Sequence, residues 1–527
     1  MTARTLYLVE MTAYDPAIAG ERVLRFASAP GHVTRPSESP ANEVYEPRLV
    51  DPGNWAQYLV DALATEGASG SGGGAVVLNN ADGALDGLLE YGFDGRPIVV
   101  RMGTAGAPHP SGFPPILTGV MEQIEPTLTT IAVVLRDRRA EVADKPFQPL
   151  KFAGDNVLPN GVEGVADDLK DKPKPLLLGK CRNLPPPLVN TTKLAYQVSS
   201  AEIRSIDGVY VGGAAVAAGT AHASLAALQA ASPAGGQYDY YLGASGDGAY
   251  LRLGTSPSAV VTCDATEGAT AADRTAAQLA RRVLVAAGVP SGDVDSASVA
   301  ALDLANPAAV GFWGGEDELT TGPVLDAILR SVGGYWAVDP LGRFRLGRLE
   351  APSGSPLLTI ERHELVATGG EPVERLSARG EGRGLPAFRV TVGYRRNWTV
   401  MADSDVVGSV GQDRRNFLKQ ELRTTAAVDA TVQAKHPMAG EKQAATLLDD
   451  EAAAAAEAAR LLDLYKVRRD LLQVRLPASL LKGAGVALGS VVALDLDRFD
   501  WSGGKSFRVV GIGGELAAGA ITLQLWG

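Results

Sequence analysis

The chain has 527 residues and a mass of 54.7 kDa, which predicts about three to five domains. Hydrophobic residues make up 46% and charged residues 21% of the chain, so its composition excludes wholesale disorder. Lys and Arg number 49 against 60 Asp and Glu, a net charge of −11. General nucleic-acid binding needs a cationic surface, so the charge argues against that class of function.

The 61 glycines and 32 prolines predict many turns and therefore many short strands. With only Cys181 and Cys263, a disulfide scaffold is excluded, although one bridge between the two remains open. The N-terminus has no apolar core followed by a small-residue cleavage site. The longest uncharged stretch, Val209–Ala221, is too short and too weakly apolar to span a bilayer. We expect a packed strand and turn there, and no integral membrane segment.

Residues 1–145 are predicted to form a β-rich domain, a small closed or half-closed barrel with one short helix at Leu85–Tyr91. The glycine-rich stretch Gly67–Gly74 is expected to be a surface loop or a hinge. The expected strands are Thr5–Met11, Val23–Ser28, Ala75–Leu78, Pro97–Met102, Ile116–Ile124 and Thr129–Leu135.

Residues 146–195 are rich in proline, which restricts the backbone to extended geometry and removes hydrogen-bond donors. We therefore expect an extended connector that lies over neighbouring surfaces. Its apolar run Pro175–Leu178 is predicted to be an edge strand.

Residues 196–380 are predicted to be an α+β module. Apolar spacing predicts one helix at Thr270–Gly288 and another that begins near Thr320 or Thr321 and ends at Gly333. The second helix leads into a predicted hairpin whose turn, Asp339-Pro340-Leu341-Gly342, has the residues of a type I turn. The strands expected in this module are Ile203–Val211, Tyr238–Leu242, Ala249–Leu253, Ala259–Cys263, Tyr335–Val338 and Phe344–Leu346.

Residues 381–527 are predicted to be a β-barrel-like module that includes a long alanine-rich helix at 441–465. A helix face made mostly of small alanine side chains is compatible with packing on a flat sheet of the same chain or on another subunit. The expected strands are 386–395, Leu471–Leu476, Ser490–Leu496, Ser506–Ile512 and Ala520–Trp526. The predicted fold class is therefore mainly β with α additions (α+β), divided among several domains.

No catalytic constellation, cofactor motif or metal-ligand spacing is apparent, so we expect neither an enzyme nor a bound cofactor or metal. The five histidines lie far from one another and from both cysteines in the sequence. The run Asn79–Gly83 is interpreted as a turn that caps the short helix, not as a calcium loop. The carboxylates Asp449, Asp450 and Glu451 are expected to be solvated on a helix face.

Arg395, Arg396 and Trp398 follow a predicted strand, and Arg and Trp are residue types that anchor interfaces. They are the candidate partner-interface residues; the alternative is an ordinary loop.

Four segments together carry a resemblance to a known family: LYLVEMTAYDPAIAGERVLRFAS, AVVLNNADGALDGLLEYGFDGRPIVVRMG, TTGPVLDAILRSVGGYWAVDPLGRFRLGRLEAP and FRVVGIGGELAAGAITLQLWG. In the order and style of their β modules they resemble the tail-tip proteins of double-stranded DNA bacteriophages. More narrowly, they resemble the central baseplate hub of long-tailed (siphovirus-like) phages and gene-transfer particles.

The resemblance implies a homotrimer whose subunits each contain two similar small β-barrels, giving a pseudo-sixfold ring between the sixfold tail tube and the threefold tip. It implies as partners the distal tail protein, the tape-measure protein and tail fibre or receptor-binding proteins, with DNA present only transiently in the lumen. It places the protein in the virion tail, after assembly in the host bacterial cytoplasm. Two alternatives stay open: a carbohydrate receptor-binding protein of the tail tip, and a tail-associated cell-wall hydrolase.

Overall fold

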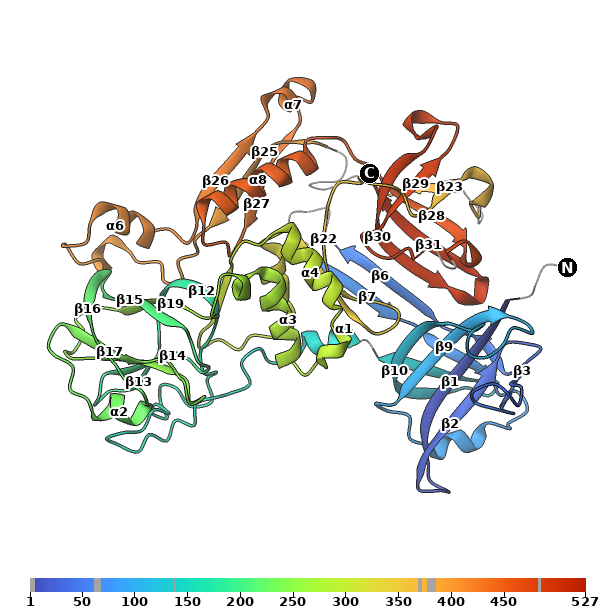
Figure 1. Ribbon diagram of the computed structural model, residues 1–527, viewed down its shortest axis with the longest axis horizontal. Helices are drawn as coiled ribbons and strands as arrows, with labels where there is room; N and C mark the ends of the chain where they lie inside the picture. Colours follow the sequence, from blue (N-terminus) through green and yellow to red (C-terminus); the bar gives the residue numbers. More distant parts are fainter. Residues whose placement is uncertain (1–4, 61–67, 137, 368–371, 377–384, 482–484) are drawn as a thin grey trace.

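The computed structural model describes residues 5–60, 68–136, 138–367, 372–376, 385–481 and 485–527. It confirms a mainly β chain with several sheets and a smaller share of helix. In Figure 1 the N-terminal and C-terminal sheets lie one above the other at one end, the central helices lie in the middle, and a further sheet lies at the opposite end.

The N-terminal sheet has seven strands in the order β2-β1-β9-β10-β11-β8-β5 and encloses an apolar core that includes Val9, Val100 and Val133. Its outermost strands, β2 and β5, are not paired with each other, and only a bridge between Phe26 of β2 and Glu46 lies between them, so the region is a half-closed barrel. All six predicted strands and the short helix, a 3-10 helix η1 (Asp86–Glu90), are confirmed. The strands are β1 (Thr5–Asp15), β2 (Gly20–Ala27), β5 (Leu49–Asp51), β8 (Ala75–Asn79), β9 (Pro97–Thr104), β10 (Pro115–Pro126) and β11 (Thr130–Arg136); β3 (His32–Val33) and β4 (Val44–Tyr45) form a separate pair.

Two strands within residues 1–145 are not part of the N-terminal sheet. β6 (Asn54–Val60) and β7 (Ala68–Gly73) pair with each other, and β6 also pairs with the C-terminal sheet. The loop or hinge expected at Gly67–Gly74 is therefore wrong for Ala68–Gly73, while Gly67 lies outside the described residues. Backbone hydrogen bonds need no side chains, so a glycine-rich segment can add to a sheet whose neighbour supplies the partners.

The connector is shorter than expected. Residues 146–175, all of them described, contain no regular helix or strand, but β12 (Leu176–Leu184) then enters a nine-stranded sheet. The strand predicted at Pro175–Leu178 is the first part of β12, which pairs with β20 over Leu176–Gly179, whereas the pairing of β12 with β19 begins only at Lys180. The predicted segment is therefore paired along one side, as expected for an edge strand, although β12 as a whole lies between β19 and β20. Leu177 and Cys181 on β12 are buried in the sheet's core, which the short sequence pattern did not indicate.

The nine-stranded sheet has the order β13-β14-β18-β17-β16-β15-β19-β12-β20. The strand and turn expected at Val209–Ala221 form the β15–β16 hairpin, although most of β16 is exposed. The remaining elements are β13 (Leu188–Asn190), β14 (Ala195–Ser199), β15 (Ser205–Val211), β16 (Ala214–Ala221), α2 (Leu225–Ala230), β17 (Gln237–Tyr241), β18 (Ala249–Leu253), β19 (Val261–Thr266) and β20 (Gly311–Gly314).

The central helices pack around the predicted helix-plus-hairpin unit, which is confirmed. Ile328 on α5 (Thr321–Arg330) and Trp336 on β21 (Gly334–Val338) are fully buried, and the Trp336 indole N–H donates to Asp326 at 2.7 Å. The helix predicted at Thr270–Gly288 is confirmed as a shorter one, α3 (Ala276–Ala286), capped by Thr275. The other elements here are α1 (Arg138–Ala143), η2 (Ala272–Arg274), η3 (Ser291–Asp293), α4 (Ser296–Ala305) and β22 (Phe344–Arg348).

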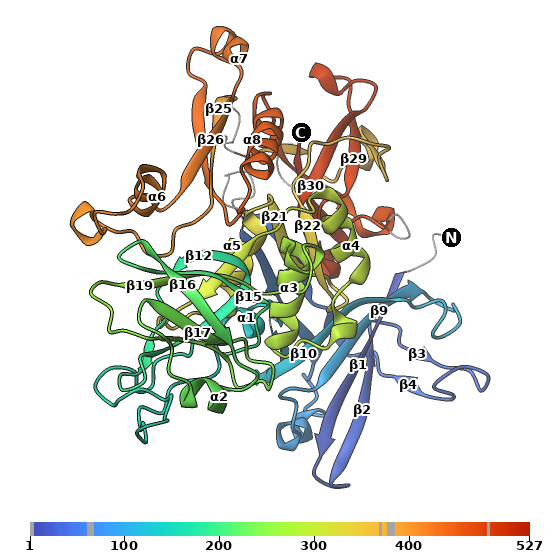
Figure 2. The ribbon, with the colours of Figure 1, turned by 60° about the vertical axis from the view of Figure 1, so that its left-hand side comes forward.

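A three-stranded sheet with helix α8 (Glu451–Tyr465) on one face projects from the body as an arm, clearest in Figure 2. The helix predicted at 441–465 is wrong at its start, because residues 441–445 belong to strand β27 (Gly440–Ala445), parallel to β25. The helix begins only after Asp450, whose carboxylate accepts a hydrogen bond from the Ala453 N–H. The arm also contains η5 (Asp403–Asp405), β25 (Ala387–Tyr394), α6 (Gln412–Leu418), β26 (Arg423–Val428) and α7 (Ala430–Lys435).

The C-terminal sheet contains the four predicted closing strands, and its core includes Leu472, Phe507 and Leu525. Its strand order is β23-β29-β30-β31-β28-β24, with β6 added along β30. The elements are β23 (Thr359–Glu361), η4 (Arg362–Glu364), β24 (Val373–Arg375), β28 (Leu471–Pro477), η6 (Ala478–Leu481), β29 (Val491–Asp495), η7 (Phe499–Trp501), β30 (Lys505–Glu515), η8 (Leu516–Ala518) and β31 (Ala520–Trp526). Among the described residues of the whole chain, no helix is long and apolar enough to cross a bilayer.

Candidate assembly interface

One four-strand arrangement occurs in both the N-terminal and the C-terminal sheet. In the first it has the order β9-β10-β11-β8, and in the second β29-β30-β31-β28. Each consists of a strand, a connection with a 3-10 helix, and a three-strand meander whose last strand pairs back with the first. All of these pairings are antiparallel. The chain therefore presents the same Greek-key type of unit twice.

The two units also share a local irregularity. The pairing of β10 with β11 shifts register between Met121 and Gln123, and that of β30 with β31 shifts between Val509 and Gly511. In both units the extra residue lies in the middle strand of the meander, where a bulge bends the strand and increases its twist. The shared bulge adds to the shared strand order as a sign of a repeated module.

Strand β6 connects the two halves of the chain. It pairs with β30 over five residue pairs, from Asn54↔Glu515 to Tyr58↔Gly511. The Trp55 side chain packs partly buried against both the N-terminal and the C-terminal core. On the other side of β6, the Gln57 amide donates to the Val338 carbonyl of the central hairpin. Strand β6 therefore contacts the N-terminal core, the C-terminal sheet and the central hairpin, and it links the three.

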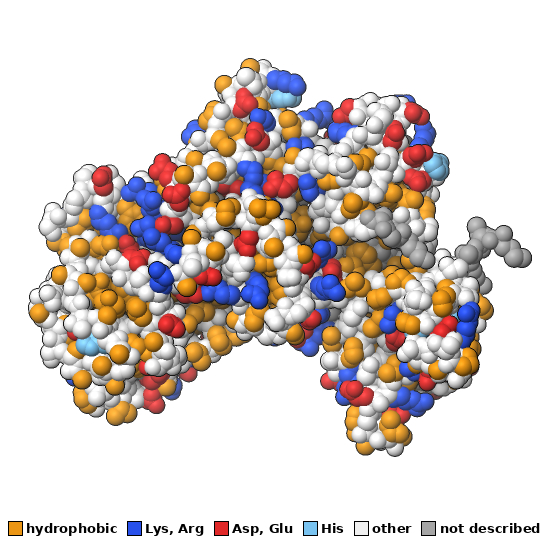
Figure 3. Space-filling model, in the orientation of Figure 1, with side chains coloured by type: hydrophobic (Ala, Val, Ile, Leu, Met, Phe, Trp, Pro, Cys, Tyr) orange, Lys and Arg blue, Asp and Glu red, His pale blue; other side chains and the backbone are white. Residues whose placement is uncertain are grey.

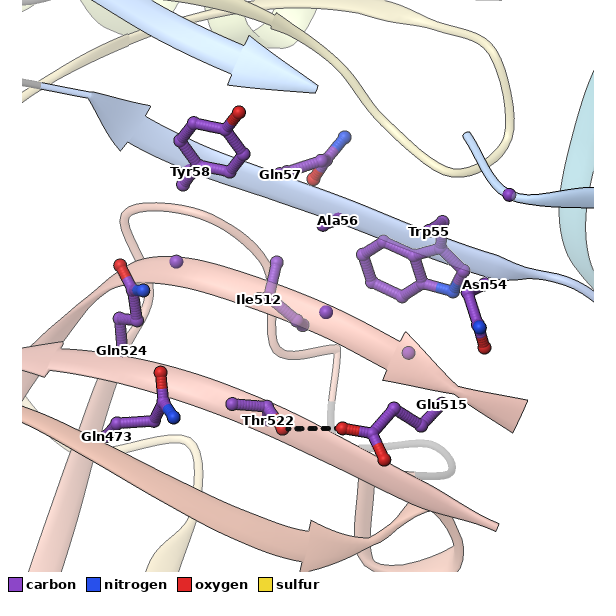
Figure 4. A pocket seen from close by; sticks show the side chains of 14 residues that line it. Asn54, Trp55, Ala56, Gln57, Tyr58, Gln473, Ile512, Glu515, Thr522 and Gln524 are labelled. Carbon is purple, nitrogen blue, oxygen red and sulfur yellow. Dashed lines mark hydrogen bonds between the residues drawn. The ribbon is translucent and has the colours of Figure 1, made fainter. Parts of the chain in front are cut away.

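Beside β6 the C-terminal sheet has a shallow hollow of about 530 Å³. Figure 4 shows Tyr58, Gln524 and Gln473 side by side across β6, β31 and β28, with Gly511 between Tyr58 and Gln524 in the strand register. Glu515, the one carboxylate among the described residues that line the hollow, accepts hydrogen bonds from Thr522 at 3.5 Å and from Arg475. Amides, a phenol and an ion-paired carboxylate can form hydrogen bonds with another surface, but they lack an acid–base pair for catalysis.

A charged seam joins the nine-stranded sheet to the arm. Arg182 on β12 donates to both carboxylate oxygens of Asp449, at 2.5 and 2.8 Å. Burial disfavours ionisation of Asp449, but the hydrogen bond from Arg182 and the nearby positive charges of Arg182, Lys180 and Arg395 together outweigh it and lower the pKa of that carboxyl. The expectation that these carboxylates are solvated is therefore wrong for Asp449, which is paired across the seam. Asp450, which caps α8, and Glu451 are exposed, as expected.

The same seam contains two buried asparagines. The Asn183 side-chain amide donates to the Asn397 side-chain oxygen at 2.8 Å and to the Thr399 carbonyl at 2.7 Å. The Asn397 amide in turn donates to the Leu418 carbonyl at 2.9 Å. Neither residue stands out in the sequence, because an isolated asparagine gives no periodic signal.

The predicted interface residues lie at this seam. Trp398 is half-buried, with its ring 5.6 Å from that of Phe312, and Arg396 lies 4.4 Å above the Trp398 ring. Arg395 has a φ of 50° and donates to the Asp449 carbonyl at 3.2 Å. Within one chain these residues therefore help to join the arm to the body. Their contact with a partner stays a prediction.

Cys181 and Cys263 are both buried and unbridged, so the bridge left open by the sequence is absent between these two described residues. Burial raises the pKa of both thiols well above its usual range, which makes them poor nucleophiles. Among the described residues no group of three His, Cys, Asp or Glu side chains is arranged to hold a metal ion. The run Asn79–Gly83 forms a turn, and its Asn80 side-chain oxygen accepts from the Leu85 N–H at 2.8 Å, but the expected side-chain cap of η1 is not formed.

The surface carries both signs of charge. On the face in Figure 3, Lys and Arg are interspersed with Asp and Glu, and hydrophobic side chains lie between them. Such a mixed surface gives many points for protein contacts and no continuous cationic track on this face.

No protein-family model matches the chain, and no curated protein matches it. Among solved structures, it is similar to a chain of the virion of a native gene transfer agent particle, at 17% identity over 68% of this chain and 85% of that one, with a TM-score of 0.44. It is also similar to the 43 kDa tail protein of prophage MuSo2 from Shewanella oneidensis, at 11% identity over 92% and 95% of the two chains and a TM-score of 0.37. For the tail protein from Neisseria meningitidis MC58 the identity is 10%, the coverage 99% and 96%, and the TM-score 0.36. Because all three TM-scores lie below 0.5, these similarities carry no functional conclusion.

Proposed function

We propose that this protein is a structural component of a phage-like tail and, within it, the central trimeric hub of the baseplate. In this role it joins the sixfold tail tube and distal tail ring to the threefold tip, and it forms part of the DNA-ejection channel. The observation that carries the proposal is the four-strand unit that occurs twice in one chain. Three chains would present six such units, which is what an adaptor between sixfold and threefold symmetry needs.

The way in which the two units are connected supports this role. β6 is continuous with the chain of the N-terminal sheet but pairs with β30 of the C-terminal sheet. Backbone pairing of this kind fixes the distance and the angle between the units, whereas a flexible linker would not. A ring built from six units needs this fixed spacing, because small errors in angle accumulate around a closed ring.

The resemblance in sequence supplies the proposed partners: the distal tail protein, the tape-measure protein and fibre or receptor-binding proteins. Like the virion location and assembly in the host cytoplasm, these are proposals. The net charge of −11 is compatible with a lumen that repels passing DNA. No step of the proposed role requires a reaction.

The test is the stoichiometry of the full chain. Light scattering after size exclusion, with the protein alone and with its neighbouring tail proteins, should give a species of three times the 54.7 kDa chain mass. Cryo-EM of the parent particle should then show three copies around the tail axis, with the two β units alternating in one ring. A chain that stays monomeric in both preparations, or a position away from the axis, would contradict the hub.

An activity assay distinguishes the structural role from the alternative of a cell-wall hydrolase. A peptidoglycan zymogram of the full chain is expected to be blank, while a purified cell-wall hydrolase on the same gel clears its band. A cleared band at the mass of this chain would contradict a purely structural role.

A further inference from the structure

A second, larger cavity of about 940 Å³ lies at one end of the C-terminal sheet, away from β6. Its walls come from η4, β24, the start of β28, and the connection from β29 to β30 that contains η7. This volume is in the range of pockets that hold small organic ligands. No part of the proposed hub role uses it.

The lining of this cavity is cationic, although the whole chain is acidic. Five cations face three carboxylates: Arg362, Arg375, Arg468, Arg498 and Lys505 against Asp470, Asp497 and Asp500. Arg375 and Arg468 share Asp470, at 3.1 and 3.9 Å, and Lys505 pairs with Asp500 at 2.8 Å. Neither Arg362 nor Arg498 has an ion-pair partner among the described residues, so the cavity has unneutralised positive charge.

Two aromatic residues of η7 give the cavity a second property. Trp501 is 6% exposed, and its indole N–H has no acceptor among the described residues. A buried donor without a partner costs free energy, which an acceptor on a ligand would recover. Phe499 is 75% exposed with a φ of 57°, a conformation that is costly for a residue with a Cβ. The exposed Phe499 ring and the unsatisfied Trp501 donor therefore lie on the same short helix, in the wall of the cavity.

The mixture of groups favours one class of ligand. Arginines and an indole N–H donate to a carboxylate or a phosphate, and the Phe499 ring offers a face for an apolar ring surface. Asp497, which has no ion-pair partner among the described residues, can accept hydrogen bonds from hydroxyl groups. A saccharide with one anionic group supplies both chemistries in a small volume, since its charge can face the arginines while its hydroxyls donate to Asp497.

We propose that this cavity binds a saccharide unit that carries a carboxylate or a phosphate group. In this arrangement Arg498 and Arg362 contact the anionic group, Trp501 donates to it or to a neighbouring oxygen, and Phe499 lies against the sugar ring. The proposal goes beyond the structural role and does not depend on it, since a hub or any other tail component could have such a site.

The test is calorimetric titration of the full chain with a glucuronate-containing disaccharide, a hexose phosphate, a neutral disaccharide of the same size and inorganic phosphate. We expect one of the two anionic sugars to bind at least about tenfold more tightly than the neutral sugar and inorganic phosphate, with affinity that falls as salt rises. In ¹H–¹⁵N spectra the Trp501 indole signal, assigned by its loss in Trp501→Phe, should shift on binding.

Variants locate the site. Arg498→Ala should weaken binding about tenfold, and Trp501→Phe should weaken it severalfold while keeping the ring. Arg281→Ala removes an exposed arginine on α3, far from the cavity in sequence and outside its lining, and should change nothing. No binding of either anionic sugar at millimolar concentration, equal binding of inorganic phosphate, or an equal loss in Arg281→Ala would overturn the proposal. Because Arg498 is exposed, its variant remains informative even if Trp501→Phe fails to fold.

Discussion

Arg182 and Asp449 are 267 residues apart in the sequence and form a two-point ion pair between β12 and the segment that leads into α8. Both side chains are largely buried, at 26% and 18% exposure, so solvent screens them only in part. Lys180 lies 3.8 Å from the same carboxylate. The pair fixes the arm to the body at the seam where Arg395 and Trp398 also lie.

Removal of this pair should loosen the seam. We expect Asp449→Ala to lower the free energy of unfolding by about 2 kcal/mol, since the part-buried Arg182 guanidinium loses both of its hydrogen bonds to this carboxylate and keeps only Asp264, at 4.0 Å, as an ion-pair partner. A double-mutant cycle with Arg182→Ala, followed by chemical denaturation, measures the interaction between the two side chains. A coupling energy near zero would show that the two groups act independently.

The same carboxylate predicts a dependence of stability on pH. Its pKa is lowered in the folded chain from the ordinary value of 3.8, because the Arg182 hydrogen bond and nearby positive charges outweigh the effect of burial. The stabilisation is therefore complete above about pH 4 and is lost as the pH falls through the lowered folded-state value. Thermal melts of the wild type and Asp449→Asn should differ at pH 6 and converge towards pH 2. A constant difference across this range would argue against the ion pair as the source.

The buried Asn397 should make a large contribution to the stability of the folded chain. It is 2% exposed and its amide donates to the backbone carbonyls of Phe417, Leu418 and Gln420. Asn397→Ala removes these three hydrogen bonds and also the oxygen that accepts from the Asn183 amide and the Thr399 N–H, so we expect the free energy of unfolding to fall by about 2–3 kcal/mol. Asn160→Ala, at an exposed loop position, is the matched control and should change stability by less than about 0.5 kcal/mol.

Two adjacent glycines on β30 test how β6 is held. A Cβ at Gly514 would come within 2.6 Å of the Trp55 indole nitrogen, whereas the nearest atom to a Cβ at Gly513 is 3.5 Å away. Gly514→Ala should therefore displace Trp55 and cost about 1–3 kcal/mol, while Gly513→Ala should be neutral or slightly stabilising. Thermal melts compare the two, and hydrogen exchange of the Tyr58 amide region reports on β6 directly. Equal effects of the two changes would contradict this packing.

The predicted interface residues can be separated by role. Trp398→Ala should cost about 2–3 kcal/mol of stability, because its ring packs against Phe312 and Trp313. Arg396 is more exposed and pairs with Glu421 at 3.1 Å, so Arg396→Ala should hardly change stability. If Arg396 contacts a partner, its variant should still weaken subunit assembly measured by light scattering. Unchanged assembly would leave it a surface residue of the loop.

Local patterns were sufficient for much of the fold. The helix at Thr321–Arg330, its hairpin and the four closing strands follow from apolar periodicity and turn residues, which act over a few neighbouring positions. The prediction failed where pairing between distant segments decided the outcome. Ala68–Gly73 has no side chains that favour a strand, and residues 441–445 resemble the helix that follows them, yet both stretches are strands because partners from elsewhere supply their hydrogen bonds.

The candidate functional residues also fall into two groups, those indicated by the sequence and those found only in the tertiary structure. The sequence by itself determined a mainly β, acidic chain of several modules and pointed to Arg395, Arg396 and Trp398 as residues of interest. Only the tertiary structure decided that Asp449 is paired with Arg182, that the four-strand unit occurs twice, and that Trp501 lines a cationic cavity. The physical reason is that strand order and ion pairing depend on which distant segments meet, and the free energy of that choice comes from burial and hydrogen bonding that no short window of sequence contains.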